Sequence, residues 1–314
     1  MWIWILAVLV VLAAAAALLY ALYRRMTSDW PRPKRRRPDR SPRPETWGDE
    51  GLYISWIGHS TLLMQMDGLR VLTDPVLYPR VGVRAFGWTF GPRRHVECPI
   101  RPEACGTVDL VLLSHAHMDH LDHPSLRRVI TRQTIVVAPR GTGYLARWHR
   151  PKAVYELGPG DVLQLDGGLE IAAIAVRHWG NRYPWNRNMG YQGYVVRRGE
   201  WSVFFAGDTA RTDLSSVQRY KPQVACMPIG AYAPAPFENA HCTPEQAWDM
   251  FLETGADVLV PIHHDTFVLS REPVEEPLER LLAAADGDRV WPMRHGETYY
   301  VKSPKSIDKP KRLD

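Results

Sequence analysis

Three histidines and an aspartate lie within six residues of the chain, in the run His115-Ala-His117-Met-Asp119-His120. The run follows the mostly apolar segment 109–113, which has the composition of a buried strand. Polar side chains that lose water at a strand end are costly unless something neutralises them, and a metal ion does so. Imidazole and carboxylate ligands without thiolate suit zinc, iron or manganese, and they leave room for a coordinated water. The run therefore predicts a catalytic metal site; the alternative is a polar loop whose histidines face solvent.

The same arrangement recurs three times further along the chain. Apolar, β-like runs at residues 170–176, 201–206 and 257–261 are each followed by a side chain that can bind a metal, namely His178, Asp208 and His263. Ligand sites in α/β proteins gather at the carboxyl ends of strands, so we expect these side chains to converge on one pocket. Seven ligands are enough for two metal ions.

The order of these motifs resembles the metallo-β-lactamase superfamily, and from residue 56 to about residue 300 the chain is similar to the N-acylphosphatidylethanolamine-hydrolysing phospholipase D group. The matching stretches are WIGHST at 56–61, LTDP at 72–75, LS at 113–114 leading into the histidine run and LD after it, HW at 178–179, FFAGDT at 204–209, PIGAY at 228–232, His241 with PEQA at 244–247, IH at 262–263 with TF at 266–267, and HGE at 295–297.

Two stretches depart from that group. His264-Asp265 stands where a Trp-Gly pair follows the last ligand histidine, and the loop after Tyr232 lacks bulkier aromatic and basic residues. Both leave the acyl-ethanolamine specificity open. The aromatic loop at 179–194 either lines a lipid-accepting groove or wraps the surface.

The resemblance implies two zinc ions, or other divalent metals, and a division of the ligands between them. One ion would be held by His115, His117 and His178, the other by Asp119, His120 and His263, with Asp208 as the bridge. Two neighbouring cations need a shared anion, and their field lowers the pKa of a bridging water towards neutrality. The implied chemistry is hydrolysis by a metal-bound hydroxide, with Asp119 and Asp208 as catalytic residues.

Two other side chains are candidates for supporting roles. Asp74, after the β-like run 69–72, is predicted to orient a ligand imidazole from behind, with a plain Asp-Pro turn as the alternative. His241 precedes Thr243-Pro-Glu-Gln, a helix start with a Thr/Gln capping box, where an anion is stabilised. The similar family uses a histidine there to contact substrate, so His241 is assigned to substrate binding. His59 and His264 stay open between a supporting role and an ordinary buried one.

Residues 2–23 contain no charged residue. As a helix they would extend about 33 Å, enough to cross the hydrocarbon core of a bilayer. We interpret them as a membrane span; a cleaved signal peptide or a buried soluble helix are the alternatives. Residues 24–43 carry nine basic and two acidic residues, a net charge of +7, which predicts that all that follows stays in the cytoplasm. Prolines there predict an extended, unpacked spacer, and the basic charge suits anionic lipid headgroups.

The whole chain has a net charge of +5, so the remainder sums to about −2 and lacks the basic footprint that nucleic acid requires. The four cysteines form no C-x-x-C pair, and reduced thiols suit a cytoplasmic domain. Helical stretches at 124–131, 142–149, 244–254 and 274–285 alternate with strands. We predict an anchor (1–23), a linker (24–49), a hydrolase domain (50–301) and a basic tail (302–314), with an α/β fold of the metallo-β-lactamase αββα sandwich type.

The sequence is therefore interpreted as a single-pass membrane protein with a dinuclear zinc hydrolase domain in the cytoplasm. Its partners are the membrane and a phospholipid substrate, such as an N-acyl phosphatidylethanolamine, and not nucleic acid. One alternative is a lactonase or other ester hydrolase, because the same chemistry attacks a carbonyl carbon. The other is an anchored lipid- or metal-binding module without turnover.

Overall fold

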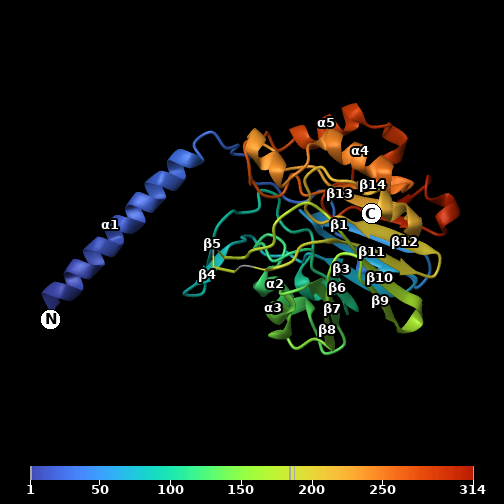
Figure 1. Cartoon of the computed structure of the whole chain (residues 1–314), viewed down its shortest axis with the longest axis horizontal. Helices are drawn as coiled ribbons and strands as arrows, with labels where there is room; N and C mark the ends of the chain where they lie inside the picture. Colours follow the sequence, from blue (N-terminus) through green and yellow to red (C-terminus); the bar gives the residue numbers. More distant parts are fainter. Residues whose placement is uncertain (1, 184, 187, 314) are drawn as a thin grey trace.

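Two β-sheets face each other at the centre of the domain (Figure 1). The structure is a computed structural model that describes residues 2–183, 185–186 and 188–313. In spatial order, the first sheet consists of β16 (Lys311–Leu313), β15 (Thr298–Val301), β1 (Leu52–Gly58), β2 (Thr61–Met66), β3 (Leu69–Thr73), β6 (Leu110–Leu112), β7 (Ile135–Pro139) and β8 (Ala153–Leu157). The second consists of β14 (Val258–Ile262), β13 (Val224–Pro228), β12 (Trp201–Phe205), β11 (Gly193–Arg198), β10 (Leu169–Ile174) and β9 (Val162–Leu165).

The core lies between the two sheets because alternate residues of each strand point to the same face. In β1, Leu52, Ile54 and Trp56 join the cluster that also holds Val203 and Phe205 of the opposite sheet. The intervening side chains of β1 face the outer layer, which contains α2 (His123–Val129) and α3 (Gly143–Arg147). On the far side, α4 (Pro244–Thr254) and α5 (Glu276–Ala284) cover the second sheet. The predicted α/β sandwich with outer helices is confirmed.

The strand directions bring the predicted ligands to one edge. In the second sheet β12, β13 and β14 run parallel, and β10 shares their direction because both β10 and β12 pair antiparallel with β11. In the first sheet β3, β6 and β7 run parallel. The segments after β10, β12 and β14 therefore leave the second sheet at one edge, and the segment after β6 leaves the first sheet at the edge where β3 ends. Ligand sites in α/β proteins are expected at such edges.

The expectation of an unpacked linker is wrong. Its backbone is extended, but Arg36 forms a parallel bridge with Val96 and its guanidinium contacts Asp265. Pro42 and Pro44 are buried. From residue 36 onward the linker is therefore part of the domain surface. The predicted basic tail also contributes structure, since β16 pairs with β15 at the edge of the first sheet.

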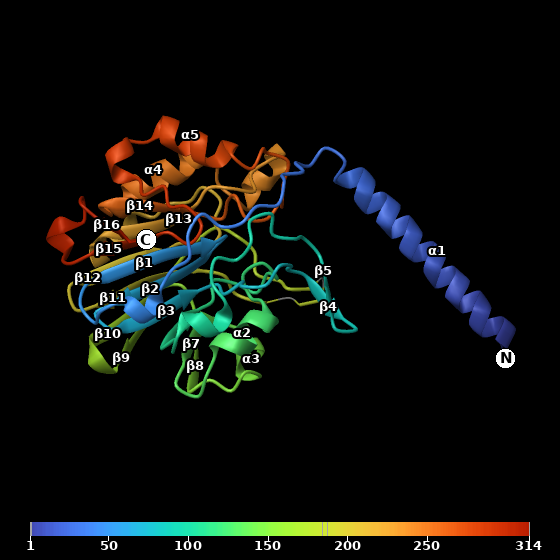
Figure 2. The same cartoon turned by 180° about the vertical axis from the view of Figure 1, so that it is seen from behind.

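Helix α1 (Trp2–Met26) extends away from the domain in both views (Figures 1 and 2). It is long and apolar enough to cross a membrane, and none of its apolar window is buried against the protein. A signal sequence near an N-terminus can also be long and apolar enough to meet this criterion.

Candidate metal centre

Three imidazole nitrogens meet at the end of β6. His115 and His117 lie on the loop between β6 and α2, and His178 follows β10 on the opposite sheet. His117 Nδ1 lies 2.8 Å from His115 Nε2 and 3.3 Å from His178 Nε2. Burial, together with the neighbouring imidazoles, lowers the pKa of His115 well below its usual value and that of His117 to about 3. Neutral imidazoles are the form that binds a metal ion.

A second group lies beside the first. It comprises His59, Asp119, His120 and His263, whose ligand atoms all lie within 4.8 Å of one another. Asp119 Oδ2 lies 3.5 Å from His120 Nε2 and 3.8 Å from His263 Nε2, and His59 Nε2 is 2.9 Å away. The set mixes nitrogen and oxygen donors, which suits zinc with a coordinated water.

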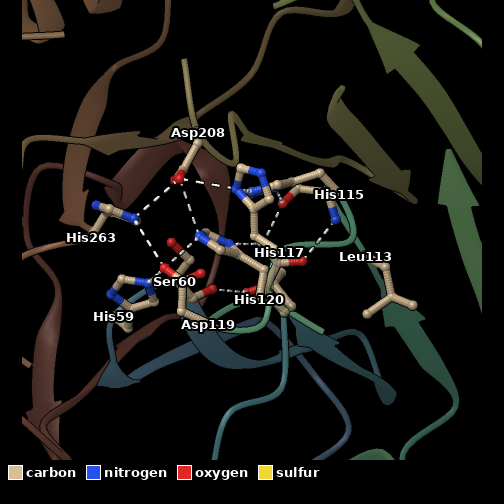
Figure 3. A network of polar contacts seen from close by, with 12 residues as sticks. His59, Ser60, Leu113, His115, His117, Asp119, His120, Asp208 and His263 are labelled. Carbon is tan, nitrogen blue, oxygen red and sulfur yellow. Dashed lines mark hydrogen bonds and ion pairs between the residues drawn. The ribbon is translucent and has the colours of Figure 1, made fainter. Parts of the chain in front are cut away.

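Asp208 lies between the two groups (Figure 3). Its Oδ2 atom is 3.2 Å from His120 Nε2 and 3.1 Å from His263 Nε2. The same oxygen lies 3.9 Å from His115 Nε2 and 3.8 Å from His178 Nε2. One carboxylate thus faces both sets of ligands, which is the geometry of a bridging group between two cations.

The charges and the orphaned atoms of this centre fit metal ions. Among the described residues, Asp208 Oδ1 is buried and has no hydrogen-bond partner, and His120 Nε2 and His263 Nε2 face Asp208 Oδ2 without the geometry of a hydrogen bond, although buried polar atoms are almost always paired. Against the effect of burial, the carboxylates of Asp208 and Asp119 raise the pKa of His263 to about 9. Despite burial, His120 and His263 in turn hold the pKa of Asp208 well below its usual value. The carboxylates therefore require buried positive charge, which divalent ions supply.

Hydrogen bonds behind the ligands fix their rings. Asp74 Oδ2 lies 2.7 Å from His120 Nδ1, and Asp74 Oδ1 accepts from the Ser114 backbone at 2.7 Å. Ser114 Oγ also lies 2.8 Å from His115 Nδ1. On the opposite sheet, His178 Nδ1 donates to the Ala240 carbonyl at 2.8 Å. The contacts with His120, His115 and His178 each occupy Nδ1 and so leave Nε2 of the same ring to face the centre.

His241 is also at the centre, with Nδ1 3.8 Å from Asp208 Oδ2. The predicted capping box of the following helix is confirmed: Thr243 Oγ1 accepts from the Gln246 amide, and Gln246 Oε1 accepts from the Thr243 amide. His241 Nδ1 has no hydrogen-bond partner among the described residues. The side chain is thus positioned beside the ligands, in a group with His178 and Asp208 whose ligand atoms lie within 4.8 Å of one another.

Sequence reasoning left His59 and His264 open, and the structure separates them. His59 contacts Asp119 directly, whereas His264 stacks on Trp56 with ring centroids 4.6 Å apart and makes no contact with Asp119 or Asp208. The available signal was the position of His59 immediately after the apolar strand β1, the same signal that singled out the other ligands. Ser114 and Ala240 were missed, and a serine or a backbone carbonyl gives no such signal.

The aromatic side chains of the loop at 179–194 lie in different surroundings. The Trp179 ring lies 4.1 Å from the His117 ring and remains half exposed. Tyr183 and Trp185 stack on each other at 5.0 Å, and Trp185 is exposed. Tyr194 belongs to β11, where it is buried and donates to the Leu113 carbonyl. Trp179 and Tyr191, whose ring lies edge-on to that of His178 with centroids 6.4 Å apart, are therefore the aromatic members of this loop that border the centre.

Comparison with known proteins shows the class. Residues 69–264 match the family described as the beta-lactamase superfamily domain, and the chain belongs to this superfamily. It is 34% identical over 248 residues to an uncharacterized protein of Mycobacterium tuberculosis, and the match covers 76% of this chain. That match spans only 65% of the length of the mycobacterial protein.

Two further matches carry descriptive names. The chain is 27% identical to N-acyl-phosphatidylethanolamine-hydrolyzing phospholipase D 1 of Caenorhabditis elegans, over 76% of this chain and 71% of the relative. Among solved structures it is similar to a metallo hydrolase of Ignicoccus hospitalis, with a TM-score of 0.60 and 22% identity over 80% of this chain and 98% of that one. The resemblance to the phospholipase group seen in the sequence is confirmed, and the structural likeness confirms the fold.

Proposed function

We propose that the protein is a membrane-anchored dinuclear zinc hydrolase that cleaves a phosphodiester bond of N-acyl phosphatidylethanolamine-like lipids, in the manner of a phospholipase D. The observation that carries the proposal is the position of Asp208 Oδ2, within 3.9 Å of nitrogens from both ligand groups. The named phospholipase among the relatives supports the substrate class.

The ligands would be shared between two metal ions as the resemblance implies. His115, His117 and His178 would hold one ion, Asp119, His120 and His263 the other, and Asp208 would contact both. Two bound ions supply an activated water and polarise the phosphoryl oxygen.

The protein's own groups supply orientation and contact with substrate. His59 Nε2 approaches Asp119 Oδ2 to 2.9 Å and would orient this carboxylate, which would receive a proton from the attacking water. His241 lies beside Asp208 with an unpaired Nδ1 and can contact the phosphate or its neighbouring oxygens. Trp179, half exposed beside His117, offers an apolar surface to the lipid at the rim of the centre.

The test combines metal analysis with a substrate panel. The full chain purified in detergent should contain about two zinc ions, and it should release phosphatidic acid from N-acyl phosphatidylethanolamine. Asp208→Ala should lose this activity, since it removes the group facing both metal positions. Turnover of lactones without turnover of any phospholipid would assign the protein to the lactonase alternative. Metal binding without turnover of either panel would support a binding module, and one iron ion per chain would overturn the zinc hydrolase.

The membrane location is part of the proposal. Helix α1 supports a single span, and the net charge of +7 over residues 24–43 supports a cytoplasmic catalytic domain. A reporter fused to the C-terminus should therefore stay on the cytoplasmic side. Cleavage of the domain by protease added outside intact cells, or removal of α1 from the mature protein, would contradict this topology.

A further inference from the structure

A small hairpin presents large apolar side chains to solvent. Its strands β4 (Val83–Ala85) and β5 (Trp88–Phe90) pair with each other and belong to neither of the two central sheets. Phe86 at the turn is 97% exposed, Trp88 is 74% exposed and Phe90 is 58% exposed. Clustered exposed aromatic residues on a folded domain indicate a surface that binds a membrane or another molecule.

Arginines surround the base of this hairpin. A cavity of about 770 Å³ is lined by Trp88 and by five arginines, with no acidic residue in its lining: Arg80, Arg84, Arg93, Arg127 and Arg128. Among the described residues, no ion pair involves the guanidinium groups of Arg84, Arg93 or Arg127, and Arg128 approaches Glu103 only to 3.9 Å. Outside residues 24–43 the chain sums to a negative charge, so this positive cluster is a local feature.

The hairpin region continues to the end of α1. A second cavity, of about 240 Å³, is lined by Tyr23, Arg24 and Trp30 on one side and by Pro92 and Arg93 on the other. Arg93 therefore borders both cavities. In Figures 1 and 2 the hairpin protrudes from the domain on the side towards which α1 extends.

We propose that hairpin β4–β5 and the arginine cavity form a docking surface for a bilayer that contains anionic lipid. Basic side chains next to exposed aromatic rings match the chemistry of a membrane interface, where the rings enter the headgroup region and arginines meet lipid phosphates. The apolar helix ends beside Arg93, so the same membrane that receives α1 would lie within reach of the hairpin. Docking would hold the catalytic domain against the bilayer and is independent of which bond the metal centre cleaves.

The test uses the full chain reconstituted into nanodiscs. One set contains phosphatidylcholine alone and the other contains added phosphatidylglycerol, at equal ionic strength. Hydrogen exchange of segment 83–90 should be slower in the anionic discs. This slowing of exchange should become smaller as salt is added, because exposed charges are screened beyond about 8 Å at physiological ionic strength.

Two double variants separate the contributions. Arg84→Gln with Arg127→Gln should lower the docked-to-undocked ratio by about 25-fold, since each basic residue near an anionic surface contributes roughly fivefold. The matched control removes two exposed arginines that do not line the cavity, Arg132→Gln with Arg219→Gln, and should leave the protection intact. Phe86→Asp with Trp88→Asp should also abolish protection, whereas Leu252→Asp with Leu282→Asp, on α4 and α5, should not.

Three results would overturn the proposal. The first is equal exchange of segment 83–90 in both kinds of nanodisc. The second is equal loss of protection in the control variants. The third is full protection by free inorganic phosphate in zwitterionic discs, which would assign the cavity to a soluble anion and not to a bilayer.

Discussion

Asp74→Asn tests whether the carboxylate behind His120 controls metal affinity. Asp74 is fully buried, and its Oδ2 atom lies 2.7 Å from His120 Nδ1. Burial raises the pKa of Asp74, and the contacts with His120 and Ser114 oppose that rise. Asparagine keeps the shape but offers His120 only a neutral acceptor, or turns a donor towards it.

The size of the effect follows from the exchanged hydrogen bond. A bond to a charged partner contributes about 1.5–3 kcal/mol and a neutral one about 0.5–1.5 kcal/mol, so the loss is about 1–1.5 kcal/mol. This corresponds to a roughly tenfold lower metal affinity, at the lower end of the 10–100-fold loss typical when such a supporting partner is changed. Competition between the purified protein and a chelator of known affinity measures it directly, with thermal melting to confirm folding.

The control for this variant is Asp122→Asn. Asp122 is another buried carboxylate nearby, but it caps α2 and accepts from Ser125 without touching any of the seven predicted ligands. Asparagine caps helices about as well as aspartate, so the fold should be retained. Wild-type metal affinity in Asp74→Asn, or an equal loss in Asp122→Asn, would refute the reasoning.

The other predictions concern one ligand, the linker and the cap of α2. Asp119→Ala should abolish hydrolysis and lower the metal content from two ions towards one while the melting temperature changes little, because the three-histidine group remains; full activity would exclude Asp119 from the site. A chain that starts at Thr46 should melt about 2–4 °C below one that starts at Pro31, since it lacks the Arg36–Asp265 contact, the Arg36–Val96 bridge and the buried Pro42 and Pro44, and each lost kcal/mol costs roughly 2–4 °C; equal melting would contradict the packed linker. Burial raises the pKa of Asp122 from 3.8 to about 6, so the native state keeps this proton longer than the unfolded chain does. The contribution of Asp122 to the free energy of unfolding should therefore decrease as pH rises from about 4 to 6. Urea unfolding at several pH values measures this, and the same pH dependence of the free energy of unfolding in wild type and Asp122→Asn would refute it.

The kinds of ligand and their order along the chain could be predicted from the sequence alone. Apolar runs followed by His115, His178, Asp208 and His263 revealed a site because strands of this fold end at a common edge. The capping box of α4 was equally readable, since it depends on residues only three positions apart. The apolar composition of α1 is likewise a local property of the chain.

The groups that support those ligands could not be predicted in this way, because they come from distant parts of the chain. His59 reaches Asp119 across 60 residues, His178 reaches the Ala240 carbonyl across 62, and Arg36 reaches Asp265 across 229. No local pattern encodes such contacts, because they depend on how the two sheets and the loops pack together. The same packing left the rings of β4–β5 in solvent and gathered arginines from separate segments beside them, although neither the hairpin nor those arginines carries a motif.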